Sequence, residues 1–178
     1  FAVWGGDLEL PTLRGEWVVP IVAIVPDYVS DKGSVILGRS QLAERWKMST
    51  VFIGAPGEET FLHQIINTMQ NKRCGHILIA SLDIVLALFD RASILLSNES
   101  GPTHLAATTD IPIVTIFGPS KEAAWKPVRE RNMTILRGAD CPPECKWGQC
   151  KAELQCVMNV TVQQVLQAAA KYLAQRSA

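Results

Sequence analysis

The residues best suited to chemistry lie in one short polar stretch, Ser97-Asn98-Glu99-Ser100-Gly101-Pro102-Thr103-His104. It follows an apolar run, Ile94 to Leu96, and precedes an alanine-rich segment. Ser100 is a good helix cap, and Pro102 stands near the first helical position, where its missing N–H does no harm. A strand, a turn of small residues and a helix start direct backbone N–H groups toward the space above a sheet. The stretch therefore predicts a phosphate-binding turn, in which Gly101 lets an anion approach the backbone closely.

A second unit repeats this plan further along the chain. The apolar run Ile113 to Phe117 ends in Gly118-Pro119-Ser120, before the helical segment Lys121 to Trp125. Taken singly, such Gly-Pro pairs are common in turns that have no role in binding. Two adjacent strands with small-residue loops at their C-terminal ends are nevertheless how open α/β sheets build ligand crevices.

Taken as a whole, this string resembles the donor-binding signature of glycosyltransferase family 9, which contains the ADP-heptose:lipopolysaccharide heptosyltransferases. The resemblance is carried by Asn98 to Ala107, by Ile111 to Ser120 and by Trp125-Lys126-Pro127. Its discriminating part is Gly-Pro-x-His-Leu-Ala-Ala, and Glu99 stands where the family usually has Asp. The resemblance covers residues 50–170 well and residues 18–49 weakly. It implies the C-terminal, nucleotide-sugar-binding domain of a two-domain GT-B enzyme.

The resemblance also implies roles for side chains in the turn. Without the motif, a lone histidine is more often a packed or surface residue. With it, His104 is expected to donate to a diphosphate oxygen, and Thr103 and the N–H groups of Ser100 through His104 to share that role. Glu99 is expected to shape the loop or meet a sugar hydroxyl, because acid–base catalysis would need a partner and an acceptor that are not visible.

Two further residues are implied by the same resemblance. Glu58 follows Gly54-Ala55-Pro56-Gly57, where the family has a Glu that binds ribose hydroxyls, and an acid beyond a strand suits a diol. The neighbouring Glu59 fits a helix first turn equally well. Lys32 lies where heptosyltransferase relatives usually have a Lys, followed by Trp-Pro, that meets the donor phosphates. Because this chain continues with Gly33-Ser34, Lys32 fits a ligand and a solvated loop cation equally.

Apolar runs alternate with amphipathic segments along the chain. Strands are expected at 18–25, 50–54, 77–79, 94–96 and 113–117, and helices at 35–46, from 58, at 82–91, at the signature turn, at 121–125 and at 162–175. Such alternation implies parallel βαβ units and a Rossmann-like, three-layer α/β fold. Residues 1–17 are interpreted as a linker or the remnant of a preceding domain, and residues 18–178 as one nucleotide-sugar-binding domain.

Composition limits the possible partners. The 178 residues suffice for one domain with a sizeable core, and the 17 basic and 17 acidic residues give no global field that would favour nucleic acid. The longest apolar runs, Val18 to Val25 and Ile77 to Phe89, are too short or interrupted, which predicts no transmembrane span. The first residues lack an initiator Met and a basic region, so we expect a cut or processed end without a secretory signal.

Four cysteines fall in a loop expected over residues 140–157: Cys141, Cys145, Cys150 and Cys156. They could bind zinc or form two disulfides with three possible connectivities. Their spacing is not that of a standard C-x2-C knuckle, and disulfides are uncommon in a reducing cytoplasm. Many family members carry cysteines here, which implies a structural staple for a long loop rather than catalysis. No metal is assigned, and zinc, disulfides and free thiols all stay open for these four cysteines.

The expected function is the donor half of an inverting glycosyltransferase. It holds a nucleotide-diphosphate sugar, ADP-heptose in the first place, for transfer to a lipopolysaccharide core acceptor. No cofactor is expected, and the acceptor contacts and the catalytic base are expected from an N-terminal domain. The expected location is the cytoplasm, with peripheral association with the inner membrane left open. Two alternatives remain at this point: a stand-alone, non-catalytic nucleotide-binding module, and a structural metal domain centred on the cysteines.

Overall fold

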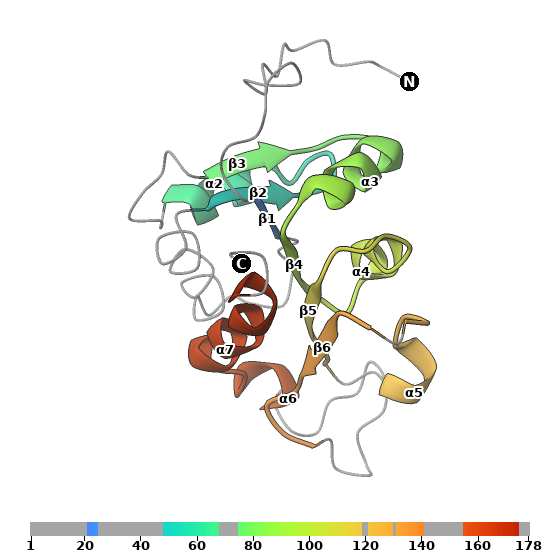
Figure 1. Ribbon diagram of the computed structural model, residues 1–178. Helices are drawn as coiled ribbons and strands as arrows, with labels where there is room; N and C mark the ends of the chain where they lie inside the picture. The colour runs from blue at the N-terminus through green and yellow to red at the C-terminus, as the bar shows by residue number, and fades with distance from the viewer. Residues whose placement is uncertain are drawn as a thin grey trace.

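One parallel sheet organises the part of the chain that the structure describes, shown in Figure 1. The structure is a computed structural model, and it describes residues 21–24, 48–67, 75–118, 121–129, 131–140 and 155–174. The strands are β1 (Ile21–Ile24), β2 (Ser49–Ile53), β3 (Gly75–Leu78), β4 (Ile94–Asn98), β5 (Ile113–Ile116) and β6 (Met133–Leu136).

The strand order is that of a Rossmann-like sheet. Within the described ranges the order is β3-β2-β1-β4-β5-β6, and every neighbouring pair is parallel. The chain winds outward in one direction from β1 to β3, and in the other from β4 to β6. The winding reverses between β1 and β4, and in open α/β sheets this switch point is where the crevice for a ligand forms.

Helices cover both faces of the sheet. They are α2 (Glu59–Asn67), α3 (Leu82–Arg91), α4 (Gly101–Ala106), α5 (Glu122–Trp125), α6 (Gln155–Met158) and α7 (Val162–Leu173). Helices α2 and α7 pack on one face, and α3 and α4 pack on the other (Figure 1). The predicted Rossmann-like fold is therefore confirmed for the described residues.

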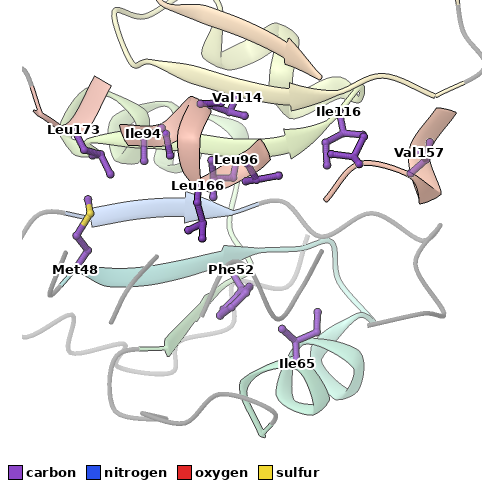
Figure 2. Close-up of a cluster of buried hydrophobic side chains, with 14 of the residues drawn as sticks. Met48, Phe52, Ile65, Ile94, Leu96, Val114, Ile116, Val157, Leu166 and Leu173 are labelled. Atoms are coloured by element: carbon purple, nitrogen blue, oxygen red, sulfur yellow. The ribbon is translucent and has the colours of Figure 1, made fainter. Parts of the chain in front are cut away.

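Strand residues alternate between these two layers because successive side chains of a strand point to opposite faces. Phe52 and Leu96 belong to the cluster with α2 and α7, and Figure 2 shows side chains of the sheet and both helices meeting there. Val51 and Leu95 belong to the cluster with α3 and α4. Burial on both sides explains why β4 begins with the uninterrupted apolar run Ile-Leu-Leu.

The expected elements and the observed ones agree at most positions. The strands expected near 50–54, 77–79, 94–96 and 113–117 and the helix at 82–91 are all present. Two elements were not expected: β6, and α6, which makes the end of the loop expected over 140–157 helical. The linker expected over 1–17 and the helix expected over 35–46 lie outside the described residues. None of the described helices is both long enough and apolar enough to span a bilayer.

Two buried hydroxyls within the sheet have no hydrogen-bond partner in the described residues. They belong to Thr50 of β2 and Thr115 of β5, both fully buried. An unpaired buried polar group costs free energy because it has lost its bonds to water. We expect Thr115→Val, which keeps the shape of the side chain, to raise the free energy of unfolding by about 1 kcal/mol. Urea denaturation measures this, and a loss of similar size would mean that the hydroxyl has a partner.

Candidate functional site

The turn between β4 and α4 has the geometry that a strand-turn-helix unit needs. Ser100 occupies the N-cap position with extended backbone angles (φ −160°, ψ 171°), and Pro102 stands in the first turn of α4. The Ser100 side chain does not cap the helix, however: its hydroxyl donates to the Asn98 carbonyl at 3.1 Å. The expected position of the cap is confirmed, whereas its expected hydrogen bond is not present.

Thr103 differs from the other residues of the expected site because it lies inside the turn. Its side chain is fully buried, and its Oγ1 lies 2.8 Å from Ser97 Oγ and donates to the Asn98 carbonyl at 2.8 Å. Its N–H donates to the Ser100 carbonyl at 3.1 Å. Both polar groups of Thr103 are thus used inside the turn, because the residue lies on the face of α4 that packs on the sheet. In this structure the polar groups of Thr103 serve the turn itself, and its expected contact with a phosphate stays a prediction.

The groups left for a ligand are fewer than the sequence suggested. Pro102 has no N–H, and no acceptor within the described ranges takes the N–H of Ser100 or Gly101. The imidazole of His104 is exposed, and among the described residues nothing hydrogen-bonds to it. The side chain of Glu99 is half-buried, and its N–H donates to the Ile116 carbonyl at 3.0 Å. The turn therefore presents two N–H groups and an imidazole, and the carboxylate of Glu99 lies beside them.

The C-terminal end of α4 is also held in place by hydrogen bonds. Such support is needed because an isolated helix of six residues is not stable in water. The Thr109 hydroxyl donates to the Ala106 carbonyl at 2.9 Å, and Arg129 Nη1 approaches the same oxygen at 3.5 Å. Burial lowers the pKa of Arg129, while the nearby Asp110 raises it. A guanidinium at the C-terminal end of a helix complements the helix dipole. The position of α4 thus depends on tertiary contacts at both ends.

Glu58 lies in the loop between β2 and α2, immediately before the helix. Its Oε2 accepts a hydrogen bond from the Ala55 N–H at 2.7 Å, and its own N–H donates to the Ala55 carbonyl at 3.1 Å. A Cβ added at Gly54 would lie 3.1 Å from this oxygen and 2.7 Å from Leu62 Cδ1. The loop therefore holds the carboxylate in one place, and glycine at position 54 leaves room for it. Glu59 is the first residue of α2 and is exposed, so the two acids are not equivalent.

The two loops lie at the same edge of the sheet. Both follow the carboxyl ends of parallel strands, and only β1 lies between β2 and β4. Two strand spacings amount to about 10 Å, so a single elongated ligand could reach both loops. The crevice expected at the switch point of the sheet is flanked by Glu58 on one side and by Glu99, Gly101 and His104 on the other.

Other expected site residues are not brought to this edge by the described structure. Lys32, Cys141, Cys145 and Cys150 lie outside the described residues. Cys156 belongs to α6 and is buried in the core cluster with α2 and α7. Within the described ranges, no group of three or more His, Cys, Asp or Glu side chains could hold a metal ion.

Comparison with known proteins identifies the family. The sequence model of glycosyltransferase family 9 (heptosyltransferase) matches residues 40–154. The chain belongs to glycosyltransferase family 9. No curated protein matches the sequence.

Solved structures of family 9 enzymes share the fold. A glycosyl transferase family 9 protein from Veillonella parvula superposes with a TM-score of 0.73 at 21% identity, over 88% of this chain and 46% of that one. The ADP-heptose lipopolysaccharide heptosyltransferase II of E. coli gives 0.70 at 19% identity, over 92% and 49%. The E. coli heptosyltransferase WaaC with ADP gives 0.63 at 19% identity, over 86% and 44%. The chain thus has the fold of one half of a GT-B glycosyltransferase and spans less than half the length of these relatives.

The sequence analysis included Ser97 and Asn98 in the polar stretch but assigned neither of them a role. The Ser97 hydroxyl lies beneath α4, and the Asn98 carbonyl accepts two hydroxyl hydrogen bonds. A signal was available, because Ser97 is a polar residue at the end of an otherwise apolar, buried strand. In such a strand a buried hydroxyl needs a partner, which the structure provides in Thr103 Oγ1 at 2.8 Å.

Proposed function

We propose that this chain is the donor-binding half of a glycosyltransferase that uses a nucleotide-diphosphate sugar of the ADP-heptose type. The observation that carries the proposal is the pairing of two loops at the carboxyl edge of the sheet, one on each side of the switch point. One loop holds a carboxylate, and the other presents N–H groups and an imidazole. These chemistries suit the two ends of a nucleoside diphosphate, a ribose diol and an anion.

Each residue has a role in this proposal. Glu58 accepts hydrogen bonds from the ribose hydroxyls through the carboxylate that the Ala55 N–H holds in place. The N–H groups of Ser100 and Gly101 and the His104 imidazole bind the diphosphate. Glu99, on the same loop, meets a hydroxyl of the donor sugar. Lys32, outside the described residues, remains a candidate for a second phosphate contact.

The chemistry follows from the charge that develops when the sugar leaves. In an inverting displacement the acceptor hydroxyl attacks the anomeric carbon while the bond to the diphosphate breaks. Positioned N–H dipoles and the imidazole stabilise the negative charge that grows on the leaving diphosphate. The acceptor, for which we propose a lipopolysaccharide core sugar, also requires a base within hydrogen-bond reach. We expect that base and the acceptor contacts from a second, N-terminal domain, and the reaction in the cytoplasm or at the inner surface of the inner membrane.

Gly101→Ala tests whether the diphosphate lies at the α4 turn. A Cβ at this position meets no atom within 4 Å in the structure, so the substitution leaves the fold unchanged. A bound phosphate would occupy that space, so we expect ADP affinity to fall by about 1 kcal/mol, roughly fivefold. Calorimetric titration of the wild-type chain and the variant with ADP and UDP measures this. Wild-type ADP affinity in the variant would place the diphosphate elsewhere, and the absence of ADP binding by the folded wild type would overturn the proposed function.

A turnover assay with ADP-heptose and a truncated lipopolysaccharide acceptor tests whether the catalytic base lies outside this chain. We expect the 178-residue chain to bind the donor nucleotide without transferring sugar, because transfer needs an acceptor hydroxyl held in line and a base beside it. Robust transfer by the purified chain would show that the base lies within it. Glu99 would then be the first residue to replace.

A further inference from the structure

Two hydroxyl groups and one backbone carbonyl beneath the α4 turn form a directed hydrogen-bond network. Thr103 Oγ1 donates to the Asn98 carbonyl at 2.8 Å, and it lies 2.8 Å from Ser97 Oγ. A hydroxyl has a single hydrogen, so Thr103, having donated to Asn98, can only accept from Ser97. The relay therefore runs from Ser97 through Thr103 to the Asn98 carbonyl. Ser97 and Thr103 are both almost completely buried, so water does not compete for these bonds.

The relay ends on a peptide group that is held at both ends. The Asn98 carbonyl accepts from Thr103 and, at 3.1 Å, from the Ser100 hydroxyl, which fills both of its lone pairs. The N–H of the same peptide belongs to Glu99 and donates to the Ile116 carbonyl at 3.0 Å. Rotating this peptide would break three hydrogen bonds at once. Its orientation sets the direction in which the chain enters Glu99, Ser100 and Gly101.

We propose that Ser97 and Thr103 are positioning residues for the diphosphate, acting through the Asn98–Glu99 peptide on the N–H groups of Ser100 and Gly101. This inference rests on the proposed function, since it assigns a purpose to the same turn. Neither hydroxyl touches the ligand. Their effect is preorganisation: donors that are already aimed need no rearrangement when the charged group arrives.

The neighbouring strand provides a matched control. Thr115 lies in register with Ser97 on β5, is fully buried, and has no hydrogen-bond partner in the described residues. Thr115→Val and Thr103→Val therefore each remove one hydroxyl oxygen from a fully buried threonine, one in the sheet and one in the helix α4 that packs on it. Only Thr103→Val breaks the relay.

The experiment compares ADP with adenosine, which lacks the phosphates, by nuclear magnetic resonance titration of the wild-type chain and the variants. We expect Thr103→Val to weaken ADP binding about tenfold, the effect of one lost hydrogen bond, and to leave adenosine binding unchanged. Thr103→Ser, which keeps the hydroxyl, restores ADP affinity. Thr115→Val binds both ligands as the wild type does. Ser97→Ala shows a smaller loss, again confined to ADP, because Thr103 still donates to Asn98.

The ratio of the ADP affinity to the adenosine affinity shows whether Thr103 positions the phosphate-binding N–H groups or only stabilises the fold. A role limited to stability lowers the free energy of unfolding without changing that ratio in the folded protein, and an unchanged ratio in Thr103→Val would overturn the proposal. Should Thr103→Val fail to fold, the ratio is read in Ser97→Ala, where a wild-type value has the same consequence. A wild-type chain that binds no ADP would instead overturn the proposed function, so the two failures are distinguishable.

Discussion

Replacing His104 with alanine is expected to weaken ADP binding by about 1–3 kcal/mol, the loss of one strong hydrogen bond to a phosphate. The imidazole is exposed, and no described residue hydrogen-bonds to it, so its removal leaves no buried group without a partner. Alanine is also a good residue for the middle of a helix. The free energy of unfolding should therefore be unchanged or slightly higher, while the affinity for ADP falls.

The matched control for this variant is His63→Ala. His63 is likewise an exposed helical histidine, but it belongs to α2. Calorimetric titration with ADP should give the wild-type affinity for His63→Ala and an affinity about 5-fold to 150-fold lower for His104→Ala. If a folded His104→Ala protein bound ADP as tightly as the wild type, His104 would be a surface residue without a role in binding.

Much of the fold could be predicted because its signals are local. The runs Ile94 to Leu96 and Ile113 to Phe117 are apolar without alternation, which is typical of strands covered on both faces. The turn residues Ser100 to Pro102 interrupt the apolar pattern at the strand end. The family 9 resemblance, which rests on this same stretch, is confirmed by the match of residues 40–154 to the family model.

Elements with weak local signals were missed. β6 is four residues long, is partly exposed along its length, and contains Thr134, whose hydroxyl pairs with that of Tyr172 in α7 at 2.8 Å. α6 has four residues and no charged group to mark its ends. Both elements depend on contacts with distant parts of the chain, which no short window of sequence displays.

The structure divides the polar groups of the turn in a way that the sequence analysis did not. The motif suggested that every polar group of the turn binds the ligand. The helical period instead separates these residues into one set that faces the sheet and another that faces away from it. Thr103 and Ala106, three positions apart, face the sheet and are buried, while Gly101 and His104 face away and are exposed. Counting this period along the motif would have divided the residues correctly. The position of Ser97 beneath the helix could not be counted in this way, because it depends on how α4 folds back over β4.

The need for glycine at position 138 also depends on tertiary packing. It follows β6, and its N–H donates to the Cys156 carbonyl of α6 at 2.7 Å. A Cβ added to Gly138 would lie 2.6 Å from two backbone atoms, the Asn159 carbonyl carbon and the Val160 nitrogen. Because these are backbone atoms, no side-chain rotation can relieve the contact. Glycine at this position therefore lets the loop after β6 pack directly on the segment between α6 and α7.

We expect Gly138→Ala to lower the free energy of unfolding by about 3 kcal/mol, because the loop must move away from α6 and the hydrogen bond to the Cys156 carbonyl must break or lengthen. Urea denaturation of the wild-type chain and the variant measures the change. Gly101→Ala is the control, since its added Cβ meets nothing within 4 Å and its free energy of unfolding should stay at or above the wild-type value. A loss below about 1 kcal/mol in Gly138→Ala would mean that the two segments can separate at little cost. The close approach of the loop to the α6–α7 segment would then contribute little to holding α7 on the sheet.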